Sequence, residues 1–475
     1  MARNNLDVLQ LGADPTGAAS SVRAFAAAIA WANAHAAGLR GGCEIAVPAG
    51  RYRVDAALPP VTAGGVVFRG SQAAALSVSA AGPVFTWSGG ASGGGIDGLT
   101  VEYPARPAAD AAVITVAGAS DLLFRNLRVS NINTLAVLGT DARRIASAVT
   151  FDQVSGKVFN SGRPSFDLRW GSALFLNGVG LYVAGVPVPA PDRASVMTTV
   201  PGTDFIRCAH GGWDTLVLSG GTNCNRYDHG VQVDAPGAVI QNLWLDNSIF
   251  DYCASDAIRL HAPSHASGGV FLVSCRGAYI VSWSGSGIRV SGDNPNELHD
   301  FSGAAIYVAG RHGVHLSGPG TRNIKLHRMR ISNPNRLQGA YAGVRVDPIG
   351  GDWEVIGGTV LADPSGGFGW RASYGIDIAA PNDRYTVQGA NFVGALANYR
   401  VEADGSASAN RLITGNLNAD YAAASVWVEA PAGRPWVNTT PWNVTVAGPG
   451  GRMLPPGHRL EPAASPRRLQ IIVHP

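Results

Sequence analysis

Apolar and polar residues alternate in short runs along most of this chain, and the runs are separated by glycine-containing turns. In six segments a small residue precedes two apolar positions that have one other residue between them. The first apolar residues of these segments recur every 26 to 32 residues. Period-2 alternation within a repeat of about 29 residues is typical of a β-solenoid. The segments are GVQVD from Gly230, AIRLH from Ala257, GIRVS from Gly287, GVHLS from Gly313, GVRVD from Gly343 and GIDIA from Gly375.

A second series of apolar runs lies between these segments and predicts a second strand in each coil. We therefore predict an all-β fold, a parallel solenoid, over residues 61–428. The runs are VIQNLWL from Val239, FLVSC from Phe271, IKLHRMRI from Ile324, WEVIGGTVL from Trp353, YTVQGANFV from Tyr385 and RLITGNLN from Arg411.

One stretch near the N-terminus has helical spacing instead. Within residues 11–34, Val22, Phe25, Ile29 and Ala32 fall on one face of a helix. Ser20 or Ser21 is placed to cap its start, and Gly38 follows its end. The open end of a solenoid would expose its apolar interior, so we expect this helix to cover that end. Lateral packing of the helix on the coils is the alternative.

The residues around this helix carry a family resemblance. Leu11-Gly12-Ala13, Asp14 and Gly17 precede the helix, and Val47-Pro48-Ala49-Gly50-Arg51-Tyr52 follow it. This opening resembles the pectate-lyase-like β-helix family of polysaccharide lyases, hydrolases and phage tailspikes. Ser20-Ser21 replace the acidic pair that the family has before the helix. The resemblance implies a right-handed single-stranded parallel β-helix with an N-terminal capping α-helix and, for tailspikes, a homotrimer.

Composition divides the chain into three regions. We expect residues 1–60 to form the N-terminal cap and residues 61–428 the β-helix. Residues 429–475 are rich in proline and glycine and lose the repeat. We expect them to form a C-terminal cap, trimerisation or attachment segment, with a flexible tail as the alternative.

Charge and cysteine content narrow the function classes. The net charge is +3 and no long Lys/Arg run occurs, so we expect no nucleic-acid partner. Five cysteines without a CxxC spacing argue against a zinc site or a disulfide framework. We expect no metal and no cofactor.

The sequence also bears on location. No N-terminal apolar segment of the signal-peptide type occurs, and no run of about 18 apolar residues predicts a membrane span. We therefore expect a virion tail or extracellular location without a signal peptide, and a phage tail or baseplate protein as a possible partner.

The six aligned segments predict an outward column of mostly polar and charged side chains. Arg259 and Arg289 are adjacent in this column, where like charges repel unless anions compensate them. Such a face suits an acidic polysaccharide, and a solvated face is the alternative. We expect substrate binding by Trp213, Trp244, Arg289, His315, Arg345 and Asp377. The column is Gln232, Arg259, Arg289, His315, Arg345 and Asp377.

The densest group of candidate catalytic residues spans two neighbouring coils. In a hydrolase, Asp228 or Asp234 would pair with Asp256 as acid and base or nucleophile. In a lyase, a histidine or Tyr227 would be the base, and an arginine would neutralise the uronate carboxylate. The candidates are Asp228, His229, Asp234, Asp256, Arg259 and His261.

Residues 183–196 and 207–216 have the composition of a long excursion from the coil, and such excursions often line binding sites. His210, Trp213 and Asp214 would then cover a groove. Together these features favour a phage tailspike-like depolymerase that binds and cleaves a bacterial surface polysaccharide or exopolysaccharide. A non-catalytic receptor-binding or structural spike is one alternative, and a bacterial polysaccharide lyase, epimerase or hydrolase is the other.

Overall fold

The computed structural model forms two compact units, and each is described separately. The first comprises residues 1–188, 197–254 and 265–273, and the second comprises residues 189–196, 255–264 and 274–475. The structure describes residues 4–36, 42–71, 73–235, 237–264, 268–379, 381–382 and 384–401, with further strands at 411–414, 425–430, 436–437, 443–447, 452–454, 459–460 and 467–474.

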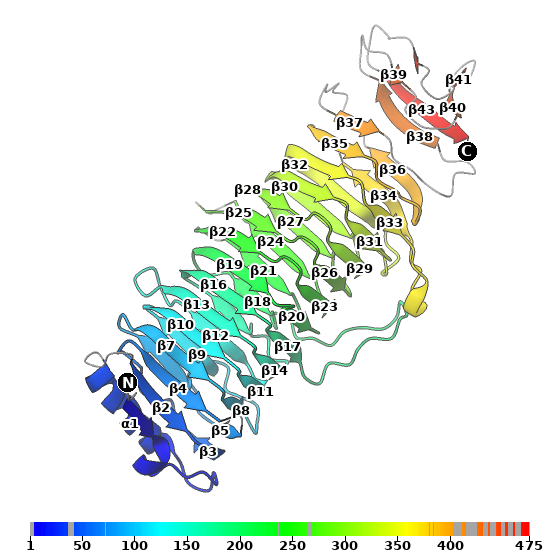
Figure 1. Ribbon diagram of the computed structural model, residues 1–475. Helices are drawn as coiled ribbons and strands as arrows, with labels where there is room; N and C mark the ends of the chain where they lie inside the picture. The colour runs from blue at the N-terminus through cyan, green and yellow to red at the C-terminus, as the bar shows by residue number, and fades with distance from the viewer. Residues whose placement is uncertain are drawn as a thin grey trace. The chain divides into compact units, whose positions relative to one another are not determined.

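The first unit is a parallel β-solenoid whose coils carry three strands each (Figure 1). The first ladder is β1 (Asn4–Asp7), β2 (Cys43–Val47), β4 (Val66–Gly70), β7 (Ser92–Asp97), β10 (Ala119–Arg125), β13 (Ala146–Asp152), β16 (Gly171–Asn177), β19 (Trp213–Ser219), β22 (Val239–Trp244) and β25 (Gly269–Ser274). The second is β6 (Phe85–Ser88), β9 (Ala112–Ala117), β12 (Thr134–Leu138), β15 (Phe166–Leu168), β18 (Ile206–Cys208) and β21 (Val231–Asp234). The third is β3 (Gly50–Val54), β5 (Ala74–Val78), β8 (Thr100–Glu102), β11 (Arg128–Ile132), β14 (Ser155–Val158), β17 (Gly180–Val183), β20 (Asn223–Asn225) and β23 (Ile249–Cys253).

The second unit repeats this arrangement. Two long strands, β30 (Val314–His327) and β32 (Ala342–Ile356), each pass through two ladders. One ladder also contains β24 (Ile258–Ala262), β27 (Ile288–Gly292), β34 (Ala372–Ile378) and β36 (Ala395–Val401). The next contains β28 (Asn296–Asp300), β35 (Tyr385–Gln388) and β37 (Arg411–Thr414). The third contains β26 (Tyr279–Ser282), β29 (Ala305–Ala309), β31 (Arg330–Ser332) and β33 (Thr359–Leu361).

These pairings confirm the predicted parallel β-solenoid, and the predicted segments stack in register. Ile258 pairs with Ile288, Ile288 with Val314, Val314 with Val344, and Val344 with Ile376. Both apolar positions of every segment are at most 2% exposed, since alternate side chains of a strand point inward. The third strand of the coils was not predicted as a separate series.

A continuous row of aromatic rings fills part of the core in the first unit. Neighbouring rings in the row have centroids 4.9 to 6.2 Å apart, and most meet edge to face. Stacked coils place equivalent inward side chains above one another, which allows one ring to contact the next. The row contains Phe68, Phe85, Trp87, Phe124, Phe151, Phe166, Phe205 and Tyr227.

The predicted N-terminal helix is confirmed as α1 (Val22–His35), preceded by the 3-10 helix η1 (Val8–Leu11). Phe25 and Ile29 are buried, and the Phe25 ring meets Tyr52 of β3 edge on at 5.9 Å. Ser21 occupies the N-cap position, but its side chain makes no capping hydrogen bond. Gly38 lies outside the described residues. The helix therefore packs its apolar face on the first coils, where β2 and β3 belong to the solenoid ladders.

The C-terminal strands pair differently from the coils. Antiparallel pairs join β38 (Ser425–Ala430) to β43 (Arg467–His474), and β43 to β40 (Asn443–Ala447). They also join β40 to β41 (Arg452–Leu454), and β39 (Trp436–Val437) to β42 (Arg459–Leu460). The loss of the repeat in the sequence thus coincides with a change from parallel to antiparallel strands.

Two further expectations concern side chains and membranes. All five cysteines are buried, as expected for small apolar residues, and none is joined by a disulfide in the part of the chain that the structure describes. Among the described residues, no helix has the length and apolar character needed to cross a membrane.

Candidate functional site

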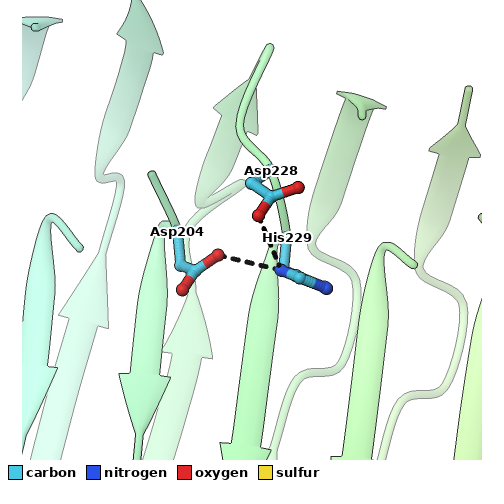
Figure 2. A group of neighbouring side chains, drawn as sticks. All are labelled: Asp204, Asp228 and His229. Atoms are coloured by element: carbon cyan, nitrogen blue, oxygen red, sulfur yellow. Dashed lines mark hydrogen bonds and ion pairs between the residues drawn. The ribbon is translucent and has the colours of Figure 1, made fainter. Parts of the chain in front are cut away.

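Two carboxylates and a histidine come together in the first unit. Nδ1 of His229 lies 2.9 Å from Oδ1 of Asp204 and 3.5 Å from Oδ2 of Asp228. Figure 2 shows both carboxylates turned toward the same ring nitrogen, Nδ1, with the ring extending away from them and Nε2 at its far side. If Nδ1–H donates to Asp204, Nε2 is the basic nitrogen of His229. The group, named here the Asp–His cluster, consists of Asp204, Asp228 and His229.

The register of two neighbouring strands builds the Asp–His cluster. Ile206 of β18 pairs with Val231 of β21, so the residues two positions earlier, Asp204 and His229, are also neighbours. Backbone bonds continue the ladder into this turn, from Phe205 N–H to the carbonyl of His229 at 2.9 Å. The solenoid thus fixes the backbone on which both side chains stand.

An arginine balances the charge of Asp204. Arg207 donates from Nε and NH2 to Oδ2 of Asp204, at 2.8 and 2.6 Å. Asp204 is completely buried, and a buried carboxylate needs such a partner to stay ionised. The second carboxylate has a different environment, since Oδ2 of Asp228 accepts from the backbone N–H of Gly202 at 2.7 Å. The two carboxylates of the cluster are therefore held by different donors.

The exposed part of the Asp–His cluster is small. Asp228 is 5% exposed and His229 is 6% exposed. A ligand can reach only the outer edges of these two side chains, while Asp204 lies behind them. This arrangement, in which a buried carboxylate orients a histidine, is the one that proton-transfer sites use.

The same three residues offer a metal-like set of donor atoms. One ligand atom from each lies within 4.8 Å of the others. However, Asp204 already binds the guanidinium of Arg207, and a cation beside that positive charge would be repelled. A hydrogen-bonded network therefore fits this cluster better than a metal site.

The structure brings Asp228 and His229 together as expected but places other candidates of the first unit apart. Asp234 is half-buried at the end of β21. Trp213 is 1% exposed and donates from Nε1 to the carbonyl of Thr215, so it offers no face to a sugar. Trp244, at the end of β22, is 38% exposed and retains an accessible ring.

Two further expectations for the first unit are wrong. Tyr227 is buried at the end of the aromatic row, and its hydroxyl is 2.7 Å from Ser165. Burial raises the pKa of Tyr227 well above its usual value, which excludes it as a base. Residues 207–216 are not part of an excursion, because they contribute to β18 and β19. The other predicted segment, residues 183–196, does enter the excursion, which runs between β17 and β18.

Asp256, Arg259, His261 and Arg289 belong to the second unit. Asp256 is 8% exposed and accepts from the N–H of Ser286 at 2.7 Å, so its position in the turn is buried and not outward. Nδ1 of His261 lies 3.1 Å from the Ser291 hydroxyl. Arg259 and Arg289 are half-buried and paired in register on β24 and β27.

The remaining substrate-binding candidates form an ion-pair network. Arg345 donates to Oδ1 of Asp347 at 2.7 and 2.6 Å and to Oδ2 of Asp377 at 2.6 Å. His315 lies 2.7 Å from the other oxygen of Asp347. Asp377 was expected to contact substrate, but it is completely buried beneath Arg345. The guanidinium of Arg345 and the imidazole of His315 are both engaged with these carboxylates.

Asp204 and Arg207 were missed in the sequence. The segment DFIRC (Asp204–Cys208) continues the predicted columns by one coil, since Arg207 pairs with Gln232. The excursion before Asp204 interrupts the spacing, so the repeat was counted only from Gly230. An alignment of the repeat segments by residue type, without a fixed spacing, would have included DFIRC and so identified Asp204 and Arg207.

No protein-family model matches the chain, and no curated protein matches it. Among solved structures, the A-module of the mannuronan C-5 epimerase AlgE4 from Azotobacter vinelandii is similar at 14% identity and a TM-score of 0.40, over 87% of this chain and 95% of that one. Tailspike protein 3 of bacteriophage CBA120 is similar at 12% identity and a TM-score of 0.46, over 86% and 61%. The catalytic unit of an α-1,3-glucanase from Streptomyces thermodiastaticus is similar at 13% identity and a TM-score of 0.45, over 88% and 69%. At these values the likenesses carry no argument about chemistry, and the strand pairings themselves establish that this chain is a parallel β-solenoid.

Proposed function

We propose that this chain binds and cleaves a bacterial surface polysaccharide or exopolysaccharide, as a phage tailspike-like depolymerase. The observation that carries the proposal is the Asp–His cluster, in which Asp204 orients His229 next to Asp228. The resemblance of residues 11–52 to the pectate-lyase-like family supports the same class. A homotrimer, attachment to a phage tail or baseplate protein, and a virion or extracellular location belong to this proposal.

The Asp–His cluster supports two reactions. In a hydrolysis, Asp228 and His229 would share the proton transfers to the leaving oxygen and from water. In a β-elimination, His229 would remove the proton next to a uronate carboxylate. In both, Arg207 pairs with Asp204, and the carboxylate of Asp204 orients the ring of His229.

A panel of bacterial polysaccharides tests the proposal, with reducing ends and ultraviolet absorbance measured together. New reducing ends with absorbance from an unsaturated uronate would indicate a lyase, and reducing ends without it a hydrolase. Loss of either signal in His229→Ala would assign the activity to this cluster. Full turnover in His229→Ala would refute the assignment.

A second function, a non-catalytic receptor-binding spike, is favoured by one observation. Asp228 and His229 are 5% and 6% exposed, which is little for residues that must touch a substrate. Binding to a polysaccharide of the panel without new reducing ends would establish this function and exclude cleavage.

A further inference from the structure

Arg259 and Arg289 form a weakly compensated pair of positive charges in the second unit. They are directly paired on the neighbouring parallel strands β24 and β27, whose backbones are about 4.8 Å apart. Both are half-buried, so solvent screens them only partly. Like charges directly opposite one another destabilise a sheet.

The protein provides little anionic compensation at this position. Among the residues that the structure describes, Arg259 has no hydrogen-bond or ion-pair partner. In the described part of the chain the one ion-pair partner of Arg289 is distant, with NH1 3.9 Å from Oδ2 of Asp256, which is not a hydrogen bond. The Nε–H of Arg289 is buried and finds no acceptor among these residues. A buried donor of this kind costs free energy unless a ligand or water accepts from it.

Two other arginines in the same column of the repeat have close carboxylate partners that compensate their charge. Arg345, two coils further along the same column, binds both Asp347 and Asp377 at 2.6 to 2.7 Å. In the first unit, Arg207 binds Asp204 at 2.6 Å. Arg259 and Arg289 thus lack the close carboxylate partners that Arg345 and Arg207 have in the described residues.

We propose that Arg259 and Arg289 form a subsite for the carboxylate of an acidic sugar residue, which makes an acidic polysaccharide the substrate class of this chain. A planar carboxylate matches the donor geometry of guanidinium groups, and its charge removes the repulsion between the two arginines. The adjacent hydroxyl of Ser291 and imidazole of His261 provide hydrogen-bonding groups for sugar hydroxyls. This inference rests on the polysaccharide-binding function proposed above.

The test measures binding, without turnover, to polygalacturonate, alginate and hyaluronan at 150 mM salt. Each polymer is also tested after reduction of its carboxylates to alcohols, which keeps the sugar ring and linkage. We expect at least one acidic polymer to bind and its reduced form to bind at least tenfold more weakly. Dextran and dextran sulfate serve as the neutral and the sulfated comparison.

Variants then locate the subsite. Arg259→Gln and Arg289→Gln should each weaken binding about tenfold, the loss expected for one charged hydrogen-bonding group. Arg289→Lys should retain part of the affinity, since lysine keeps the positive charge but lacks the planar pair of N–H donors of a guanidinium. Arg322→Gln, which removes an exposed arginine paired with Glu297, is the matched control and should bind within twofold of the wild type. Unchanged thermal midpoints would show that the glutamine variants remain folded.

Several results would overturn the inference. They are absence of binding to every carboxylated polymer, equal binding of the reduced forms, wild-type binding by both glutamine variants, or arginine-dependent preference for dextran sulfate. Failure of the inference is distinguishable from failure of the proposed function. Cleavage of a neutral polysaccharide unaffected by these variants would refute only the subsite, whereas arginine-dependent binding without cleavage would refute only the enzymatic activity.

Discussion

Nδ1 of His229 lies 2.9 Å from Oδ1 of Asp204, a carboxylate that has no exposed surface. Because Arg207 binds the other oxygen of Asp204, the carboxylate is held in place and fixes the imidazole in one orientation. The linked side chains of Arg207, Asp204 and His229 therefore form a candidate site for proton transfer on this coil of the solenoid.

The first prediction concerns this orientation. On a polysaccharide that the wild type cleaves, Asp204→Asn should lower kcat by about 100-fold or more, because an amide can hold the wrong histidine tautomer. His229→Ala should lower it at least as much. Steady-state kinetics on purified variants measure both effects.

The control is His210→Ala, which changes an exposed histidine of the same unit. It should retain the wild-type kcat. Equal activity of Asp204→Asn and the wild type would mean that His229 does not need Asp204 for catalysis.

A second prediction concerns the excursion between β17 and β18. Its residues 189–196 belong to the second unit, where Arg336 donates to the carbonyls of Asp192, Arg193 and Ser195 at 3.1 to 3.2 Å. The guanidinium of Arg336 also lies 4.4 Å from the centre of the Trp283 ring. Arg336 is 1% exposed, so these contacts are shielded from water.

Replacing this arginine should release the excursion. In Arg336→Met the three carbonyls lose their shared donor, and we expect trypsin to cleave after Arg193 at least tenfold faster than in the wild type. Mass spectrometry of timed digests locates and times the cut. Arg311→Met, at an exposed arginine, is the control and should be digested like the wild type. Equal digestion of Arg336→Met would show that the excursion is held by other contacts.

A third prediction concerns acid stability. The pKa of His312 is lowered to about 3, chiefly by burial and also by the nearby charges of His315 and Arg345. Nδ1 of His312 accepts from the backbone N–H of Ala342 at 3.0 Å, a bond that protonation of Nδ1 would break. The native state therefore resists protonation of this ring.

The difference in the pKa of His312 between the folded and unfolded states makes the free energy of unfolding depend on pH. The unfolded chain protonates His312 near pH 6.5, whereas the folded chain does so only near pH 3. The stabilising contribution is present above pH 6.5 and is lost as the pH falls from 6.5 towards 3. His312→Gln should show a smaller fall in thermal midpoint over this range than the wild type. An identical pH dependence would indicate that His312 is not held neutral.

A fourth prediction concerns the aromatic row. Phe151 is completely buried, with ring centroids of Phe124 and Phe166 at 4.9 and 5.1 Å. Phe151→Ala should lower the free energy of unfolding by about 3 to 5 kcal/mol, because it removes buried apolar surface and leaves a cavity. Denaturant unfolding measures this loss.

Phe175 provides the matched control, since it lies on β16 and is 38% exposed. Phe175→Ala should change the free energy of unfolding by no more than about 0.5 kcal/mol. A small effect of Phe151→Ala would mean that the row contributes little to stability.

The sequence by itself determined the solenoid, the N-terminal helix and the inward columns. Alternation of apolar and polar residues is a local property, and parallel stacking turns it directly into inward and outward faces. Asp228 and His229 were also predicted as members of one group of candidate catalytic residues, although Asp228 was paired there with Asp256.

Only the tertiary structure decided which charged residues compensate one another. Asp204 and Arg207 follow an excursion that breaks the spacing, so the contact of Asp204 with His229 follows from strand register and not from sequence distance. In the same way, Arg345 and Arg289 occupy equivalent positions in the repeat, yet one binds two carboxylates and the other has a buried donor without an acceptor. Side-chain reach across neighbouring coils decides this difference, and the repeat pattern carries no information about it.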